Sequence, residues 1–200
     1  GVHGAGSIGM LATPHQTLEE LFLLGKLAHE FANGNVDFRT RQSEFSADGK
    51  MQGAPWLGLK IAEIPQLDRV LVVGSTLCKD HPLLAQRLRQ AAKGQLQLNL
   101  VNPVDDDLLM RVANKAVVAP SQLVHTLAQV VKAVAQARRA AAPAEVQDVE
   151  VSDAARRIGE SLAAGGNVAR FLGNLAQHHP AATQLHALAQ ALAGLLGAKF

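Results

Sequence analysis

Short apolar runs alternate along this chain with longer stretches in which apolar residues recur at helical spacing. The clearest run is at residues 70–73, Val-Leu-Val-Val, which has no polar interruption. Such a run is typical of a strand buried on both faces of a parallel sheet. Pro82 suits the first position of a following helix, because that position needs no backbone N–H, and Gly94 suits its end. The pattern predicts a strand–turn–helix unit, whose turn lies where parallel sheets bind ligands.

The same alternation continues towards the end of the chain. Further strands are predicted at residues 97–101, 116–119 and 168–172. Ser121 and Ser152 are suited to cap helices that extend to about residues 139 and 164. We therefore predict an α/β fold, namely a three-layer αβα sandwich with a mostly parallel, Rossmann-like sheet. Its crossovers are expected to be right-handed.

The first forty residues carry a weaker version of this pattern. Thr17 and Glu20 have the spacing of a capping box, so a helix is predicted to begin there, and residues 35–38 form a short strand. Residues 40–58 are expected to be an irregular excursion, and Trp56 makes this excursion our candidate for a contact with the rest of a longer protein. The predicted buried face of the helix consists of Leu18, Leu21, Phe22, Gly25 and Ala28.

The domain organisation that we expect has three parts. Residues 1–140 form a Rossmann-like domain, and the alanine-rich, acidic residues 141–151 form a linker. Residues 152–200 add another βα unit, either as a second lobe or as an extension of the first sheet. This last part repeats the theme of the first unit, because Gly173 and His179-Pro180 echo Gly74 and His81-Pro82.

Composition narrows the possible functions. Hydrophobic residues make up 48% of the chain and charged residues 18%, so the chain can build a core. A net charge of +2 without a dense basic run favours neither nucleic acid nor an anionic membrane as a partner. The single cysteine, Cys78, excludes a disulfide or a four-cysteine iron–sulfur cluster within the chain. The chain opens without a methionine, so we interpret it as a fragment of a longer protein, and its apolar stretches are too short for a membrane span.

The candidate chemistry is sparse. Residues 4–9 spell G-x-G-x-x-G, but a dinucleotide fingerprint needs a strand before it and a helix opening from it. The eight histidines lack metal-ligand spacing, and Ser75 does not lie in G-x-S-x-G, so we predict no catalytic or metal site. The predicted ligand crevice lies at the carboxyl ends of the strands at 70–73 and 97–101, and it is lined by Gly74, Ser75, Thr76, His81, Asn102 and Pro103.

Several motifs resemble one known family. Residues 68–89, with a buried strand, Gly74-Ser75 and then His81-Pro82, resemble the molybdopterin oxidoreductase family, as do residues 18–28 and the Asn-Val-Asp strand at 35–39. Bacterial NADH-quinone oxidoreductase (respiratory complex I) has an iron–sulfur subunit that contains a domain of this family. More narrowly, the chain resembles that subunit. This narrower resemblance rests on residues 54–58, 102–110, 113–115, 173–180 and 185–190.

The chain departs from the cofactor-bearing members of that family. Thr76 stands where those members usually have Asn, and Asn102-Pro103-Val104 stands where they have Asp-Pro-Arg. The arginine that would grip a cofactor phosphate is therefore missing. Three carboxylates, at residues 105–107, would moreover repel a phosphate. The predicted crevice is accordingly expected to be vestigial and to bind no pterin dinucleotide.

The resemblance implies a scaffold domain in an electron-transfer subunit, without an active site or cofactor of its own. Iron–sulfur clusters would belong to the upstream part of the parent subunit. Its partners would be the rest of that subunit and the other peripheral-arm subunits of complex I, on the cytoplasmic face of the plasma membrane. Two alternatives remain open: a fragment of an active molybdopterin-dependent oxidoreductase that holds part of a pterin-guanine dinucleotide, and a free-standing nucleotide-binding module.

Overall fold

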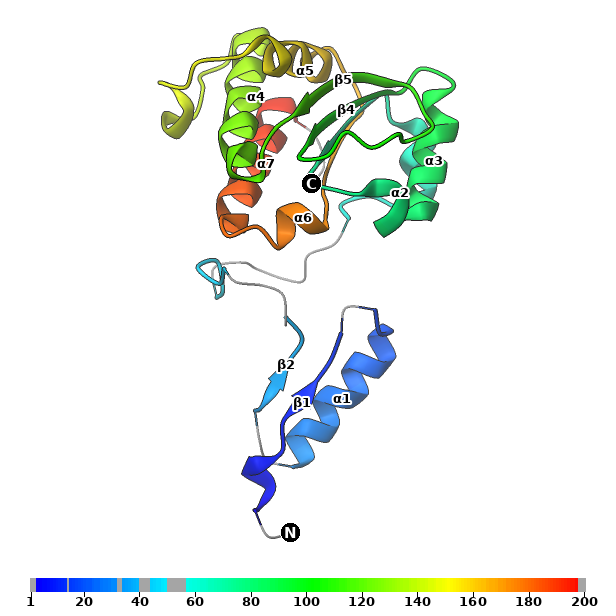
Figure 1. The fold of residues 1–200 in the computed structure, drawn as a ribbon, viewed down its shortest axis with the longest axis vertical. Coiled ribbons are helices and arrows are strands. Elements are labelled where there is room, and N and C mark those ends of the chain that lie inside the picture. Colours follow the sequence, from blue (N-terminus) through cyan, green and yellow to red (C-terminus); the bar gives the residue numbers. More distant parts are fainter. Residues whose placement is uncertain (1–2, 14, 32–33, 40–43, 50–56, 198–200) are drawn as a thin grey trace. The chain divides into compact units, whose positions relative to one another are not determined.

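The computed structural model describes residues 3–13, 15–31, 34–39, 44–49 and 57–197 (Figure 1). Two compact units divide the chain, Gly1–Gln42 and Ser43–Phe200, and each is described by itself. The division thus falls after residue 42, whereas the sequence suggested a boundary near residue 140. Trp56 and most of the predicted excursion at 40–58 lie outside the described residues.

The first unit is a single strand–helix–strand element. Strand β1 (Met10–Leu11) pairs in parallel with β2 (Val36–Asp37), and α1 (Leu18–Glu30) connects them. The predicted capping box is confirmed, because the Glu20 N–H donates to Thr17 Oγ1 at 3.2 Å and the Thr17 N–H donates to Glu20 Oε2 at 2.8 Å. Local sequence alone therefore fixes where this helix begins.

The predicted buried face of α1 is not formed in this unit. Among the helix residues only Ala28 is buried, while Leu18 is 80% exposed and Phe22 is 61% exposed. The reason is the size of the sheet, because two strands of two residues each cannot cover a 13-residue helix. The predicted burial of this face is therefore wrong for this unit, because it needs more surface than the two strands offer.

The second unit contains a four-stranded sheet in the order β5-β4-β3-β6, in which every neighbouring pair is parallel. The predicted α/β sandwich is confirmed, with β3 as a central strand paired on both sides. Strand β6 lies beside β3, so the residues after 152 extend the same sheet. The strands are β3 (Arg69–Val73), β4 (Gln97–Asn102), β5 (Val112–Val117) and β6 (Val168–Leu172).

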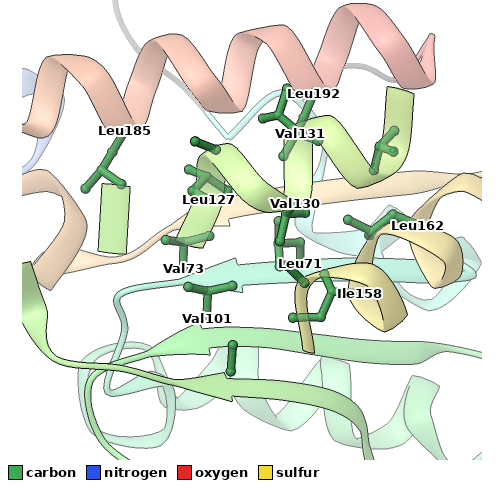
Figure 2. Close-up of a cluster of buried hydrophobic side chains, with 14 of the residues drawn as sticks. Leu71, Val73, Val101, Leu127, Val130, Val131, Ile158, Leu162, Leu185 and Leu192 are labelled. Atoms are coloured by element: carbon green, nitrogen blue, oxygen red, sulfur yellow. The ribbon is translucent and has the colours of Figure 1, made fainter. Parts of the chain in front are cut away.

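Helices cover both faces of this sheet (Figure 1). Leu71 and Val73 point towards α4, α5 and α7, as Figure 2 shows, while Val70 and Val72 pack on the α3 side. This alternation follows from the strand geometry, in which successive side chains point to opposite faces. The helices are α2 (Leu77–Asp80), α3 (Pro82–Ala92), α4 (Leu123–Arg138), α5 (Asp153–Ala163), α6 (Asn174–Gln177) and α7 (Ala182–Leu196). In the part of the chain that the structure describes, none of the helices is both long and apolar enough to cross a membrane.

Residues 141–151, which the composition suggested as a linker, pack onto the unit. They contain the short 3-10 helix Ala144–Val146, and Val146 is buried in the core beside α4. Lys132 of α4 donates to the carbonyl oxygens of Gln147 at 2.6 Å and Val149 at 2.8 Å. This segment is therefore a packed connection within one unit, because Val146 is buried in the core and the carbonyl groups of Gln147 and Val149 accept hydrogen bonds from α4.

Strand β5 begins four residues earlier than the run predicted at 116–119. It contains Asn114 and Lys115, which interrupt the apolar run used to find strands. Both polar residues have partners: the Asn114 amide donates to buried Asn99 Oδ1 at 2.8 Å, and the Lys115 ammonium pairs with Asp105 at 2.7 Å. Most residues of this edge strand are only partly buried or exposed, so the strand accommodates polar side chains, and a search for continuous apolar residues misplaces it.

Candidate functional site: the carboxyl edge of the sheet

The residues predicted to line the crevice lie at the carboxyl ends of β3 and β4. Gly74, Ser75 and Thr76 follow β3, whereas Asn102 is the last residue of β4 and Pro103 follows it. The structure brings the two strand ends together, because the Ser75 N–H donates to Asn102 Oδ1 at 2.9 Å. His81 lies apart from this contact, since it follows the short helix α2, and it is exposed.

The backbone donors of this edge are used within the protein. The Gly74 N–H donates to the Val101 carbonyl at 2.9 Å. The Thr76 N–H and hydroxyl both donate to Asp80 Oδ2, at 3.1 and 2.6 Å. A bound phosphate at such a turn depends on free backbone N–H groups that point towards it. Asp80 and Asn102 supply the acceptors that such an anion would otherwise provide.

The third strand end, that of β6, closes the edge from the other side. The Gly173 N–H donates to the Val73 carbonyl at 2.9 Å, and the Ala176 N–H donates to the Gly74 carbonyl at 3.2 Å. A Cβ atom on Gly173 would lie 2.3 Å from the Ser75 Cβ and 2.5 Å from the Gly74 oxygen. The two turns are therefore in direct backbone contact, and only glycine fits at residue 173.

Sequence reasoning missed two members of this site. Asp80 was not among the residues predicted for this edge, although it accepts hydrogen bonds from the Thr76 N–H and hydroxyl. Gly173 was seen as an echo of Gly74, but nothing in a single sequence shows that the two turns meet. The signal that could have found this contact is the repeated strand–Gly pattern, because neighbouring parallel strands carry their turns to the same edge.

The acidic residues after β4 are partly neutralised. Asp105 forms its ion pair with Lys115, and Asp107 Oδ1 accepts from the Leu109 N–H at 2.9 Å. This N–H contact accompanies a left-handed backbone at Leu109, with φ of 51°. The expected repulsion of a phosphate by three carboxylates is therefore weaker than the sequence suggested, because Asp105 has a cation beside it.

His179, the second His-Pro histidine, bridges two elements at this end of the unit. Its Nε2 lies 3.0 Å from the Pro120 carbonyl oxygen, and its Nδ1 lies 3.0 Å from the Ala181 nitrogen. A backbone N–H can only donate to an unprotonated Nδ1, so the neutral ring carries its proton on Nε2 and donates it to Pro120. Within the described residues, no group of three or more His, Cys, Asp or Glu side chains could hold a metal ion.

The glycine-rich motif at residues 4–9 lacks the context of a dinucleotide fingerprint. Gly4 precedes a 3-10 helix at Ala5–Ser7, and β1 follows the motif. The first α-helix begins only at Leu18, so no helix opens from the glycines towards a pyrophosphate. The motif therefore does not form a nucleotide site of this type, which weakens the interpretation as a free-standing nucleotide-binding module.

Comparison with known proteins identifies the family. The model of the molybdopterin oxidoreductase family matches residues 2–199. The chain belongs to the molybdopterin oxidoreductase family. Over 95 residues it is 33% identical to a protein named "Putative formate dehydrogenase YrhE" from Bacillus subtilis (strain 168). The match covers 46% of this chain and 10% of that relative.

The carboxyl edge of this molybdopterin oxidoreductase domain can be tested against the cofactor that the family name implies. The N–H groups of Gly74, Ser75, Thr76 and His81 all donate to acceptors of the protein, and Pro103 has none to offer. The contact of Gly173 with Gly74 and Ser75 leaves no room between the turns that follow β3 and β6. These residues do not fit a phosphate-bearing pterin dinucleotide in the arrangement that the structure has.

We expect Asn102→Ala to destabilise the protein by about 1–3 kcal/mol, because it leaves the Ser75 N–H without its acceptor in a buried site. The same change removes the bond from the Asn102 amide to the Val104 carbonyl at 3.0 Å. Urea unfolding followed by circular dichroism measures the loss. Asn174→Ala, a change in the short helix α6, is the control, and an equal effect of the two substitutions would contradict the role given to Asn102.

Proposed function

We propose that this chain is a scaffold domain in an iron–sulfur subunit of NADH-quinone oxidoreductase, namely the subunit that contains a domain of the molybdopterin oxidoreductase family. In this proposal the chain has no cofactor or active site of its own. In this role the domain keeps the sheet and helices of the molybdopterin oxidoreductase family while the carboxyl edge is filled by protein groups. The parent subunit would carry the iron–sulfur clusters in its upstream part and dock with other peripheral-arm subunits of the complex.

The observation that carries this proposal is the internal use of the edge donors. Asn102 and Asp80 accept the N–H groups of Ser75 and Thr76, which in a phosphate site would have to be free. The sequence supports the same direction, since Val104 stands where an arginine would give a bidentate phosphate contact. The narrower resemblance to the iron–sulfur subunit of complex I is the reason for proposing NADH-quinone oxidoreductase as the parent complex.

The second candidate is a domain of an active molybdopterin-dependent oxidoreductase. It is supported by the similarity to the Bacillus subtilis protein named as a formate dehydrogenase. In that case the dinucleotide would bind only after the turns at Gly74 and Gly173 had moved apart. The strand-end location of the site would stay the same, because it follows from the topology of the sheet.

Metal analysis of the native protein separates these two functions. The parent protein is purified from the native organism by means of an affinity tag, and the iron and molybdenum contents per chain are measured. We expect iron without molybdenum, together with NADH:quinone oxidoreductase activity in the purified material. Stoichiometric molybdenum, with activity towards a small substrate and not towards quinone, would establish the second candidate instead.

Ligand binding gives an independent test on the chain itself. Guanosine diphosphate serves as the probe, because it carries the nucleotide and the diphosphate of a pterin-guanine dinucleotide. Calorimetric titration is expected to give no measurable heat of binding for either GDP or NADH. A dissociation constant in the micromolar range for GDP, lost in a variant of the Gly74 turn, would contradict the scaffold proposal.

A further inference from the structure

Residues 44–49, the described part of the segment that leads into the sheet, are fastened to the beginning of α7. Glu44 is the centre of this contact. Its Oε2 accepts from the Thr183 N–H at 2.9 Å and from the Thr183 hydroxyl, and its Oε1 accepts from the Ser46 N–H at 2.7 Å. The Ser46 hydroxyl lies 3.3 Å from the Thr183 hydroxyl. A single carboxylate thus joins residues that are 139 positions apart in the sequence.

The charge of Glu44 suits the place where it binds. Thr183 is the second residue of α7, a helix of 15 residues, so its N–H is one of those without a partner inside the helix. A negative charge near such an end is favoured by the helix dipole. Hydrogen bonds from the Ser46 and Thr183 side chains, followed by those from their N–H groups, lower the pKa of Glu44 to about 2. The carboxylate is therefore ionised at neutral pH.

The position of this contact matters because α7 follows the carboxyl end of β6, through the turn at Gly173 and the short helix α6. Glu44 accepts hydrogen bonds from Thr183, although the two residues are remote in sequence. Asp80 plays the corresponding role for Thr76, which is only four residues away. The Thr183 donors are consequently closed to any other anion while Glu44 is bound.

We propose that residues 44–49 form a strap, and that Glu44 is the latch that holds this strap on the beginning of α7. The latch fixes the point at which the chain enters the Ser43–Phe200 unit. Removing the carboxylate should therefore open the strap and the first turn of α7, while α4 and the sheet stay protected. This inference does not depend on the proposed function, since it concerns only contacts inside one unit.

Hydrogen exchange on the whole chain at neutral pH, read by mass spectrometry, tests the latch. Glu44→Ala is expected to raise exchange at residues 44–49 and at the Thr183 amide by about three- to tenfold, the effect of losing charge-assisted hydrogen bonds. Glu44→Gln keeps the shape and one acceptor oxygen, so a smaller increase is expected at the same amides. Glu150→Ala, which removes the same charge from an exposed glutamate elsewhere in the unit, should leave these amides unchanged.

A different set of results would overturn the latch. Unchanged exchange at Thr183 in Glu44→Ala would show that the carboxylate does not hold the strap. An equal rise at the amides of α4 would point to general destabilisation, and Thr183→Val then decides, because it removes the hydroxyl contact and keeps the N–H. The double variant Thr183→Val with Glu44→Ala gives a last test of coupling. If its increase in exchange at residues 44–49 equals the product of the two single increases, the two residues are not coupled and the proposal fails.

Discussion

Replacing Gly173 with alanine is expected to destabilise the protein by about 3 kcal/mol or more, which is at the upper end of the cost of overpacking. The added Cβ would lie 2.3 Å from the Ser75 Cβ and 2.5 Å from the Gly74 oxygen, distances that real Cβ atoms do not adopt. Because these neighbours belong to the adjacent turn and are fixed by its backbone, they cannot rotate away. Urea unfolding, or a fall in melting temperature followed by circular dichroism, measures the loss.

The control for this substitution is Gly194→Ala, in α7. A Cβ on Gly194 has no heavy atom within 4 Å, so alanine is expected to stabilise the helix by up to about 1 kcal/mol. The two substitutions add the same methyl group, and only its surroundings differ. A Gly173→Ala variant as stable as the original chain would mean that β3 and β6 do not meet at their carboxyl ends as described.

Replacing Leu71 with alanine is expected to cost about 3–5 kcal/mol. Leu71 lies in the central strand β3 and is fully buried against α4 and its neighbours (Figure 2). The loss contains both the transfer of the missing carbons and the cavity that rigid neighbours on all sides leave behind. The free energy of unfolding from urea titration, with an unchanged dependence on urea concentration, measures it.

Leu83→Ala provides the matched comparison. Leu83 is a leucine of α3 that is 78% exposed, so its truncation is expected to change stability by less than about 0.5 kcal/mol. Similar losses for the two variants would contradict the placement of Leu71 in the core. A large loss for Leu83 alone would instead indicate that this side chain is covered by a partner in solution.

Much of the fold could be predicted from local pattern. The apolar run at 70–73 became the central strand, because a strand covered on both faces consists mainly of apolar residues. Pro82 is the first residue of α3, as its missing N–H allows. The edge strand β5 was placed too late, since Asn114 and Lys115 interrupt its apolar run. Burial of the face of α1 was also predicted wrongly, because the pattern shows that a face is apolar but does not show what covers it.

The turn residues that lie at this edge were predicted from the sequence, but the hydrogen bonds that join them were not. That Gly74, Ser75 and Asn102 lie at one edge follows from the rule that parallel strands carry their turns to the same side. That Asn102 accepts from Ser75, and that Asp80 folds back on Thr76, depends on side-chain directions that no spacing reveals. The departures from the family pattern predict a missing phosphate contact, and the structure shows only that Asn102 and Asp80 accept the N–H groups of this turn.

The sequence by itself determined the α/β class, the central strand and the ends of the best-marked helices, because these depend on periodicity and on the chemistry of caps and prolines. Only the tertiary structure decided that β6 joins the sheet of β3, β4 and β5, that Gly173 presses against Ser75, and that Glu44 reaches Thr183. The physical reason is the distance along the sequence over which each kind of interaction acts. Periodicity and capping act over a few residues, whereas these contacts join segments about 100 or more positions apart, and only the folded backbone brings them together.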